Sequence, residues 1–124
     1  MRQESERIQD AELEVMQVLW RSPEPVPLAE IRRELSARCG WEDSTVKTLL
    51  RRLCAKGAVR LESRGMYRAV LTQAEYGRWS AKRFVSKVFE GSAKKLVAAL
   101  VSDGQLSRED IDELSALFHQ EEPK

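Results

Sequence analysis

Residues 41–71 read W-E-D-S-T-V-K-T-L-L-R-R-L-C-A-K-G-A-V-R-L-E-S-R-G-M-Y-R-A-V-L, and this stretch decides the fold. Apolar residues recur at helical spacing from about Ser44 to Lys56, and Gly57 ends that helix. The run A-V-R-L, a turn at Arg64–Gly65 and the alternating run M-Y-R-A-V-L then predict a β-hairpin. A helix followed by a short hairpin is the order of a recognition helix and its wing, so the stretch predicts a winged helix-turn-helix domain.

Positive charge is concentrated in the same stretch. From Ser44 to Leu71 there are seven basic residues and one acid, Glu62, although the whole chain of 124 residues carries a formal net charge of only +1. The basic residues are Lys47, Arg51, Arg52, Lys56, Arg60, Arg64 and Arg68. Cations gathered on a helix and its wing are typical of a surface that binds the phosphates of duplex DNA.

The predicted recognition helix separates an apolar face from a polar one. Its apolar residues recur at spacings of three and four and are expected to pack on the preceding helices. Short polar side chains at its start allow close approach to base edges, whereas the arginines are suited to phosphate. A solvated polar face with ordinary cations is the alternative, and the arginines of the wing favour DNA over it. The predicted DNA-binding residues are Ser44, Thr45, Lys47, Thr48, Arg51, Arg52, Arg60, Arg64 and Arg68.

Two helices are predicted before the recognition helix. Ala11–Trp20 is apolar enough to be mostly buried, and it ends at R-S-P-E-P-V-P, whose prolines exclude helix. Val26 is expected to add a short edge strand beside the wing. A second helix, from Leu28 to Ala37, carries apolar residues at spacings of three and four on one face.

Amphipathic helices are also predicted after the wing. Apolar stripes run from Gln73 to Val101 with a break at residues 90–92, and a further helix runs from about Arg108 to His119, with Ser107 and Asp110 as a capping box. These stripes either complete the core of the winged domain or meet a second copy of the chain. Because the winged domain has a core of its own, a dimer is favoured. The predicted dimer interface consists of Phe84, Val88, Leu96, Leu100, Ile111, Leu114 and Leu117.

The expected fold class is therefore mainly α. A winged helix-turn-helix DNA-binding domain, with three helices and a small β-wing, is predicted over residues 1–71. A helical dimerisation domain is predicted over residues 72–124. Symmetric dimers suit palindromic DNA sites, because each subunit meets one half-site.

Catalysis, metals and membranes find no support in the sequence. His119 is the only histidine, so no catalytic set built on histidine pairs can be assembled, and no glycine-rich phosphate loop occurs. The acidic residues at 109–113 are interpreted as a solvated helix face. No apolar run is long enough to span a membrane, and the first residues lack the apolar segment of a signal peptide. We expect a cytoplasmic protein with no membrane insertion, no enzyme activity, no cofactor and no metal site.

Several stretches spread over nearly the whole chain carry a family resemblance. They are I-Q-D-A-E-L-E-V-M-Q-V-L-W at 8–20, G-W-E-D-S-T-V-K-T-L-L-R-R-L at 40–53, K-G-A-V at 56–59, S-R-G-M-Y-R-A at 63–69 and L-S-R-E-D-I-D-E-L at 106–114. These stretches resemble the penicillinase-repressor (BlaI/MecI/CopY) family of winged-helix transcriptional regulators. Glu42 and Asp43 stand where relatives have Ser-Pro, and Asp43 is then the expected helix cap.

The resemblance implies a homodimeric repressor that occupies a dyad operator in double-stranded DNA. It also implies a sensor protease as a partner. After this protease detects a β-lactam, the repressor is cleaved inside the dimerisation domain, near Ala99–Leu100 in this chain. Alternatively, these two residues are only packing residues of the interface. The paired cysteines of copper-responsive relatives are absent after Cys54. The alternative function is a winged-helix module that contacts an acidic protein partner without reading DNA.

Overall fold

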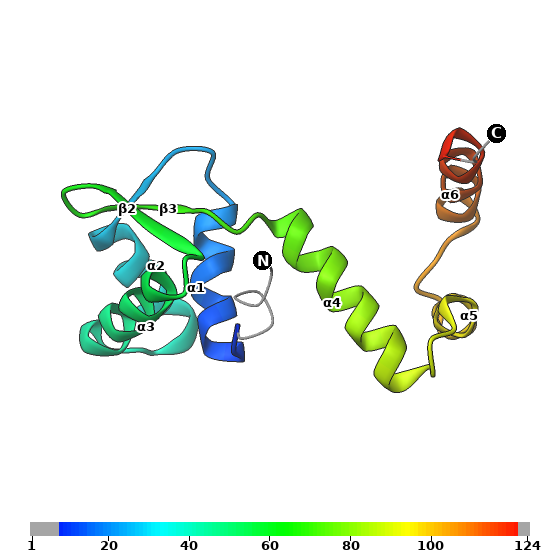
Figure 1. Ribbon diagram of the computed structural model, residues 1–124, viewed down its shortest axis with the longest axis horizontal. Coiled ribbons are helices and arrows are strands. Elements are labelled where there is room, and N and C mark those ends of the chain that lie inside the picture. Colours follow the sequence, from blue (N-terminus) through cyan, green and yellow to red (C-terminus); the bar gives the residue numbers. More distant parts are fainter. Residues whose placement is uncertain (1–7, 122–124) are drawn as a thin grey trace. The chain divides into compact units, whose positions relative to one another are not determined.

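The computed structural model describes residues 8–121 (Figure 1). In chain order the elements are α1 Asp10–Trp20, β1 Val26–Pro27, α2 Leu28–Cys39, α3 Asp43–Ala55, β2 Val59–Ser63, β3 Met66–Ala69, α4 Gln73–Val88, α5 Ala93–Ser102 and α6 Arg108–Glu121. The described residues divide into two compact units, the first ending at Trp79 and the second beginning at Ser80, so α4 begins in the first unit and ends in the second. The described chain is mainly helical with one small sheet, which confirms the predicted fold class.

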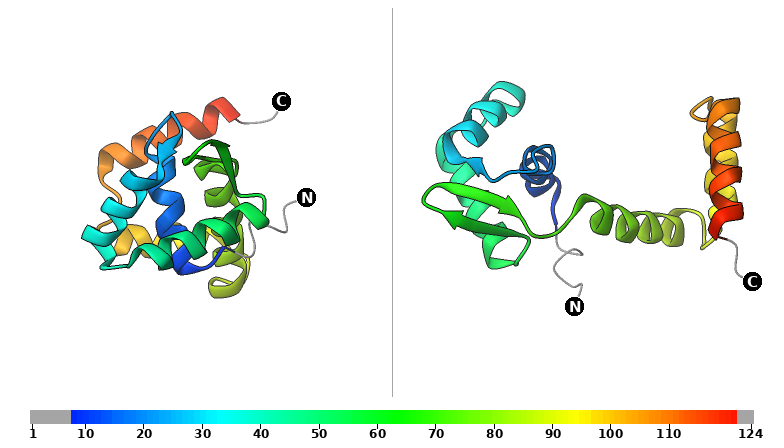
Figure 2. Two further views of the ribbon diagram at one scale, coloured as in Figure 1. Left: turned by 90° about the vertical axis from the view of Figure 1, so that its left-hand side faces the viewer. Right: turned by 90° about the horizontal axis from the view of Figure 1, so that it is seen from above.

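The first unit is built around one apolar core. α1, α2 and α3 pack against one another, and the sheet contacts α1 and α3 (Figure 2). Burying one large aliphatic side chain contributes about 1.5–3 kcal/mol, so the cluster gives this unit a core of its own, as the sequence predicted. The buried apolar residues are Val15, Met16, Val18, Leu19, Val26, Ile31, Leu35, Val46, Leu49, Leu50, Leu53, Ala58, Val59 and Leu71.

Two glycines in the left-handed conformation limit the helices of the helix-turn-helix. Gly40, with φ of 71°, is the C-cap of α2, and Gly57, with φ of 82°, lies where the chain leaves α3 for β2. Residues with a Cβ rarely adopt this conformation, so glycine is favoured at both ends. α3 thus covers Asp43–Ala55, close to the predicted range.

The three strands form an antiparallel sheet in the order β1-β3-β2. Val26 of β1 pairs with Tyr67 of β3, which confirms the edge strand expected beside the wing. Within the wing, Arg60 of β2 pairs with Arg68 of β3, and the register shifts between residues 61 and 63. The wing is therefore a hairpin with an irregularity next to its turn.

Aromatic side chains hold the start of α4 in the first unit. The ring centroids of Trp20 and Tyr76 are 5.9 Å apart, and those of Tyr76 and Trp79 are 6.0 Å apart. The indole Nε1 of Trp20 also donates a hydrogen bond of 2.8 Å to the carbonyl of Leu71. These contacts explain why the first unit reaches Trp79, whereas the sequence suggested a boundary after residue 71.

The second unit consists of capped helices without an internal core. Every residue from 80 to 120 keeps at least partial exposure to solvent. The Ser92 side chain caps α5 by accepting a hydrogen bond of 3.2 Å from the backbone N–H of Lys95. At the start of α6, Ser107 and Asp110 exchange two side-chain-to-backbone hydrogen bonds of 3.0 Å, which confirms the predicted capping box.

Candidate nucleic-acid interface

α3 directs its polar residues away from the core. Its buried residues follow the predicted helical spacing and lie in the core cluster, so the remaining side chains point to the opposite side. The buried residues are Val46, Leu49, Leu50 and Leu53. Of the predicted contact residues on this helix, Thr48 is half-buried and the others are exposed: Ser44, Thr45, Lys47, Arg51 and Arg52.

The expected cap of α3 is wrong by one residue. Glu42 is the N-cap, without a side-chain hydrogen bond to the helix, and Asp43 is the first helical residue. Asp43 Oδ1 lies 3.8 Å from Nε of Arg32 in α2. Its carboxylate also lies in the first turn, where negative charge is favourable for the helix dipole. Asp43 therefore connects α2 to the start of α3 instead of capping it.

One part of the α3 surface is hollowed. A cavity of about 260 Å³ is lined by Ser44, Thr45, Thr48, Leu49 and Arg52. Hydroxyl groups and a guanidinium group therefore gather around one depression along α3, and each of them can donate hydrogen bonds. Lys47 and Arg51 lie toward the other edge of the same face by helical spacing.

The cations of this face differ from the cations that hold the helices together. Lys47, Arg51, Arg52 and Arg64 form no ion pair with any of residues 8–121. By contrast, three arginines form ion pairs that link different helices. Arg21, which directly follows α1, pairs with a carboxylate of α2, and two arginines of α2 pair with carboxylates of α1 and α3. These pairs are Arg21–Glu34, Arg32–Asp43 and Arg38–Glu14. The cations on α3 and at the turn of the wing are therefore available to an external anion.

The wing brings two of its predicted arginines together around one carboxylate. Glu62 Oε1 accepts hydrogen bonds from Arg60 Nη2 at 3.1 Å and Nε at 3.3 Å, and from Arg68 Nε at 3.1 Å. The bond from Arg60, followed by the bond from Arg68, holds the pKa of Glu62 below its ordinary value. Arg64 stands at the turn, outside this arrangement.

Lys56 has a structural contact that the sequence did not predict. Its Nζ donates a hydrogen bond of 2.6 Å to Glu12 Oε1, and Glu12 is only 1% exposed. The same oxygen accepts a hydrogen bond of 2.9 Å from the backbone N–H of Gln9. A buried carboxylate is costly unless it is paired and hydrogen-bonded. Lys56 therefore joins the end of α3 to the start of α1, although it belongs to the basic stretch of the sequence.

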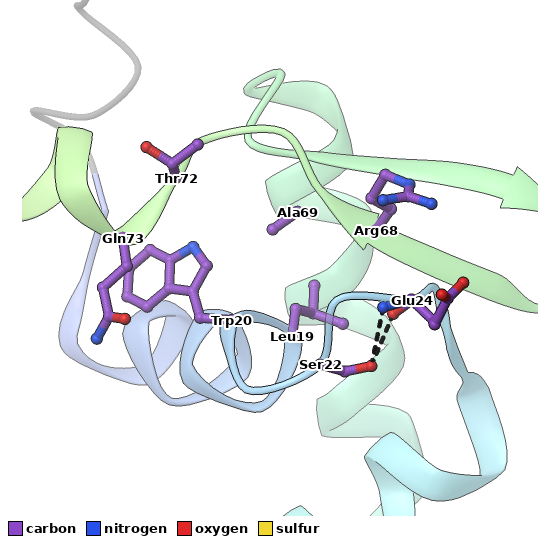
Figure 3. Close-up of a pocket in the computed structure, with 8 residues that line it drawn as sticks. All are labelled: Leu19, Trp20, Ser22, Glu24, Arg68, Ala69, Thr72 and Gln73. Carbon is purple, nitrogen blue, oxygen red and sulfur yellow. Dashed lines mark hydrogen bonds between the residues drawn. The ribbon is translucent and has the colours of Figure 1, made fainter.

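A second hollow, of about 230 Å³, lies between the end of α1, β3 and the start of α4. Figure 3 shows Trp20 and Gln73 toward one end of the view, and Arg68 and Glu24 toward the other. Three of its polar side chains are engaged within the chain: Trp20 bonds to a backbone carbonyl, the Ser22 hydroxyl to the backbone of Glu24, and Arg68 to Glu62. We assign no ligand to this hollow.

A helix with exposed hydroxyls and unpaired cations, next to a basic hairpin, defines a winged-helix DNA-binding protein. The model of the family described as penicillinase repressor matches residues 8–120, and the chain belongs to this family. The family comprises DNA-binding transcriptional repressors and not enzymes, so the predicted resemblance and the predicted class of function are confirmed. Within residues 8–121, no helix is long and apolar enough to cross a membrane.

Named relatives support the same assignment. The chain is 31% identical to the penicillinase repressor of Bacillus licheniformis over 117 residues, which cover 92% of this chain and 91% of that one. It is 27% identical to the methicillin resistance regulatory protein MecI of Staphylococcus aureus (strain N315), over 90% of this chain and 93% of that one. The solution structure of the DNA binding domain of the repressor BlaI matches with a TM-score of 0.52 and 36% identity, over 56% of this chain and 88% of that chain.

Proposed function

We propose that the chain is a homodimeric transcriptional repressor that acts in the cytoplasm by occupying a dyad operator. α3 enters the major groove, and the wing meets the adjoining DNA backbone. The residues assigned to base edges or nearby phosphates are Ser44, Thr45, Lys47 and Thr48. The residues assigned to phosphates are Arg51, Arg52, Arg60, Arg64 and Arg68.

The observation that carries this proposal is the distribution of paired and unpaired cations. Lys47, Arg51, Arg52 and Arg64 have no carboxylate partner among residues 8–121, whereas Lys56 of the same basic stretch is held by buried Glu12. Each phosphate that such a cation neutralises releases condensed counter-ions, which makes binding favourable and dependent on salt. The unpaired cations lie on α3 and at the turn of the wing, the two elements that a winged helix presents to DNA.

Exposed apolar side chains of the second unit support the dimer. Several large hydrophobic residues of α4, α5 and α6 are 39–65% exposed, and exposed apolar patches mark interaction surfaces. The exposed members that the sequence predicted are Phe84, Val88, Ile111, Leu114 and Leu117. The other two predicted residues, Leu96 and Leu100, are half-buried. The prediction left out Val97, Val101 and Phe118, which are also exposed.

Selection of DNA from a random-sequence duplex library by the full chain tests this function. The expected product is an inverted repeat whose half-sites lie about 10 base pairs apart, or a multiple of that, because two α3 helices related by a two-fold axis read it. Titration of this duplex should give two chains per site. Recovery of no preferred sequence, or of a single half-site bound by one chain, would contradict the proposal.

We further propose that cleavage by a sensor protease releases the repressor from its operator. The bond Ala99–Leu100 lies inside α5, where the carbonyl of Ala99 accepts a hydrogen bond of 3.0 Å from Asp103. Cleavage therefore requires local unfolding of α5, and the helical position favours the alternative that both residues serve in packing. Cells treated with a β-lactam and blotted for a fragment ending near residue 99 distinguish the two roles. An intact repressor that leaves its operator would exclude cleavage.

A further inference from the structure

Two arginines stand directly opposite each other in the wing. Arg60 of β2 and Arg68 of β3 are partners in the antiparallel register. Like charges in this position destabilise a strand pair. Glu62 accepts hydrogen bonds from both guanidinium groups and thereby offsets the repulsion that the register creates. The wing thus contains its own counter-ion.

Glu62 occupies the donors that a phosphate would use. Its Oε1 accepts hydrogen bonds from both Nε and Nη2 of Arg60, the two donors on one edge of the guanidinium group, and a bidentate phosphate contact uses such an edge. The side chains of Arg60, Arg68 and Glu62 are 60%, 37% and 35% exposed, so an external phosphate can reach the cluster. Carboxylate and phosphate therefore compete for the same donors.

We propose that Glu62 is an internal counter-ion that DNA phosphates must displace, and that it limits what Arg60 and Arg68 add to DNA affinity. This inference rests on the proposed function, because it requires the wing to meet DNA. In the free protein both arginines are held by Glu62. In the complex they turn to the DNA backbone, and the carboxylate remains beside the phosphates as an unfavourable charge.

The effect of Glu62 falls on the part of binding that does not depend on sequence. Non-specific binding is supplied almost entirely by phosphate contacts. A counter-ion in the wing therefore weakens binding to every duplex, while the hydroxyl groups of Thr45 and Thr48 on α3 are untouched. Arg64, which has no ion-pair partner among residues 8–121, is left as the leading phosphate contact of the wing.

The test measures binding of the full chain and its Glu62→Gln variant by fluorescence anisotropy, from about 50 to 200 mM salt. The probes are the duplex recovered by selection and a random-sequence duplex of equal length. Glutamine keeps the shape of the side chain and removes its charge. We expect roughly threefold to tenfold tighter binding to both duplexes at low salt, with a salt slope steeper by about 0.9 for each phosphate gained.

Two controls separate this role from others. Glu109→Gln makes the same change of net charge on α6, and an equal gain in that variant would overturn the proposal. Adding Glu62→Gln to an Arg60→Gln/Arg68→Gln variant should give a smaller gain than in the unaltered chain, because Glu62 no longer holds either arginine and only its repulsion of the phosphates is removed. An equal gain in the two backgrounds would overturn the proposal. Unchanged or weaker binding of Glu62→Gln would also overturn the proposal while leaving the DNA-binding function intact. Failure of the unaltered chain to bind either duplex would contradict both the role of Glu62 and the proposed DNA-binding function.

Discussion

Glu12 is a buried acid whose partner, Lys56, lies in the basic stretch of residues 44–71. The Glu12 side chain is 2% exposed and that of Lys56 is 20% exposed. The sequence contains a signal for this pair. Glu12 stands three, four and seven positions before Val15, Met16 and Leu19, so it shares the apolar face of α1 and needs a partner there.

Replacing Lys56 with methionine is expected to lower the free energy of unfolding by about 3 kcal/mol, because Glu12 is left as an unpaired buried charge. Lys47→Met is the matched control, since Lys47 is exposed and forms no ion pair with residues 8–121. Its effect should stay within about 0.5 kcal/mol. Urea denaturation measures both, and equal losses would contradict the structural role of Lys56.

The titration of Glu62 reports the wing contacts directly. Arg60→Ala should raise the pKa of Glu62 toward its ordinary value, and Arg68→Ala should raise it less, because Arg60 supplies the larger interaction. NMR titration of the Glu62 carboxyl carbon in the full chain measures this. Since the folded pKa is the lower one, the stabilising contribution is complete above the unfolded pKa and is lost as pH falls through the folded pKa. The reverse order of the two variants would contradict the geometry.

At the scale of elements, local signals in the sequence were sufficient for the helix-turn-helix and its edge strand. Helical spacing ended by Gly57 predicted α3. Val26, which lies among the prolines after α1, was expected as a short edge strand beside the wing. The contacts inside the wing could not be predicted in this way. They depend on a register that shifts between residues 61 and 63, and charge alone placed Arg60 and Arg68 on DNA without revealing their bond to Glu62.

The first turns of α4 stabilise the winged unit. A fragment of residues 1–79 is expected to be more stable than a fragment of residues 1–71 by about 1–3 kcal/mol, because each aromatic pair adds about 0.5–1.5 kcal/mol beyond its buried area. Urea denaturation of the two fragments measures the difference. Tyr76→Ala in the longer fragment should remove most of the gain, since Tyr76 contacts both Trp20 and Trp79. Equal stability of the fragments would contradict this role.

At the scale of the whole molecule, the sequence predicted amphipathic helices beyond the wing but could not show which surface they cover. The start of the α4 stripe packs on α1 through Tyr76, whereas the later apolar residues stay exposed. The apolar periodicity of the sequence is the same whether a helix packs on its own winged unit or on a second chain. It predicts that a face is buried and does not identify the surface that buries it. None of residues 80–120 is fully buried, and this exposure supports the proposed dimer.

The double variant Leu114→Glu/Leu117→Glu tests that partner surface. We expect a monomer at micromolar concentration by sedimentation velocity, with the winged unit still folded. Dyad binding should weaken by roughly two to four orders of magnitude, because the two DNA-binding units are no longer linked. Ala116→Glu places a charge on the other side of α6 by helical spacing and should leave the dimer intact. A dimer that survives both charges would contradict the assigned surface.

The central claim is that the unpaired cations of α3 hold DNA by its phosphates. The salt dependence of binding by the Arg51→Ala/Arg52→Ala variant tests it most directly. We predict weaker binding to operator and unrelated duplex alike, with the slope of log affinity against log salt reduced by about 1.8, or about 0.9 for each lost phosphate contact. A folded variant with unchanged affinity and unchanged slope would contradict the account.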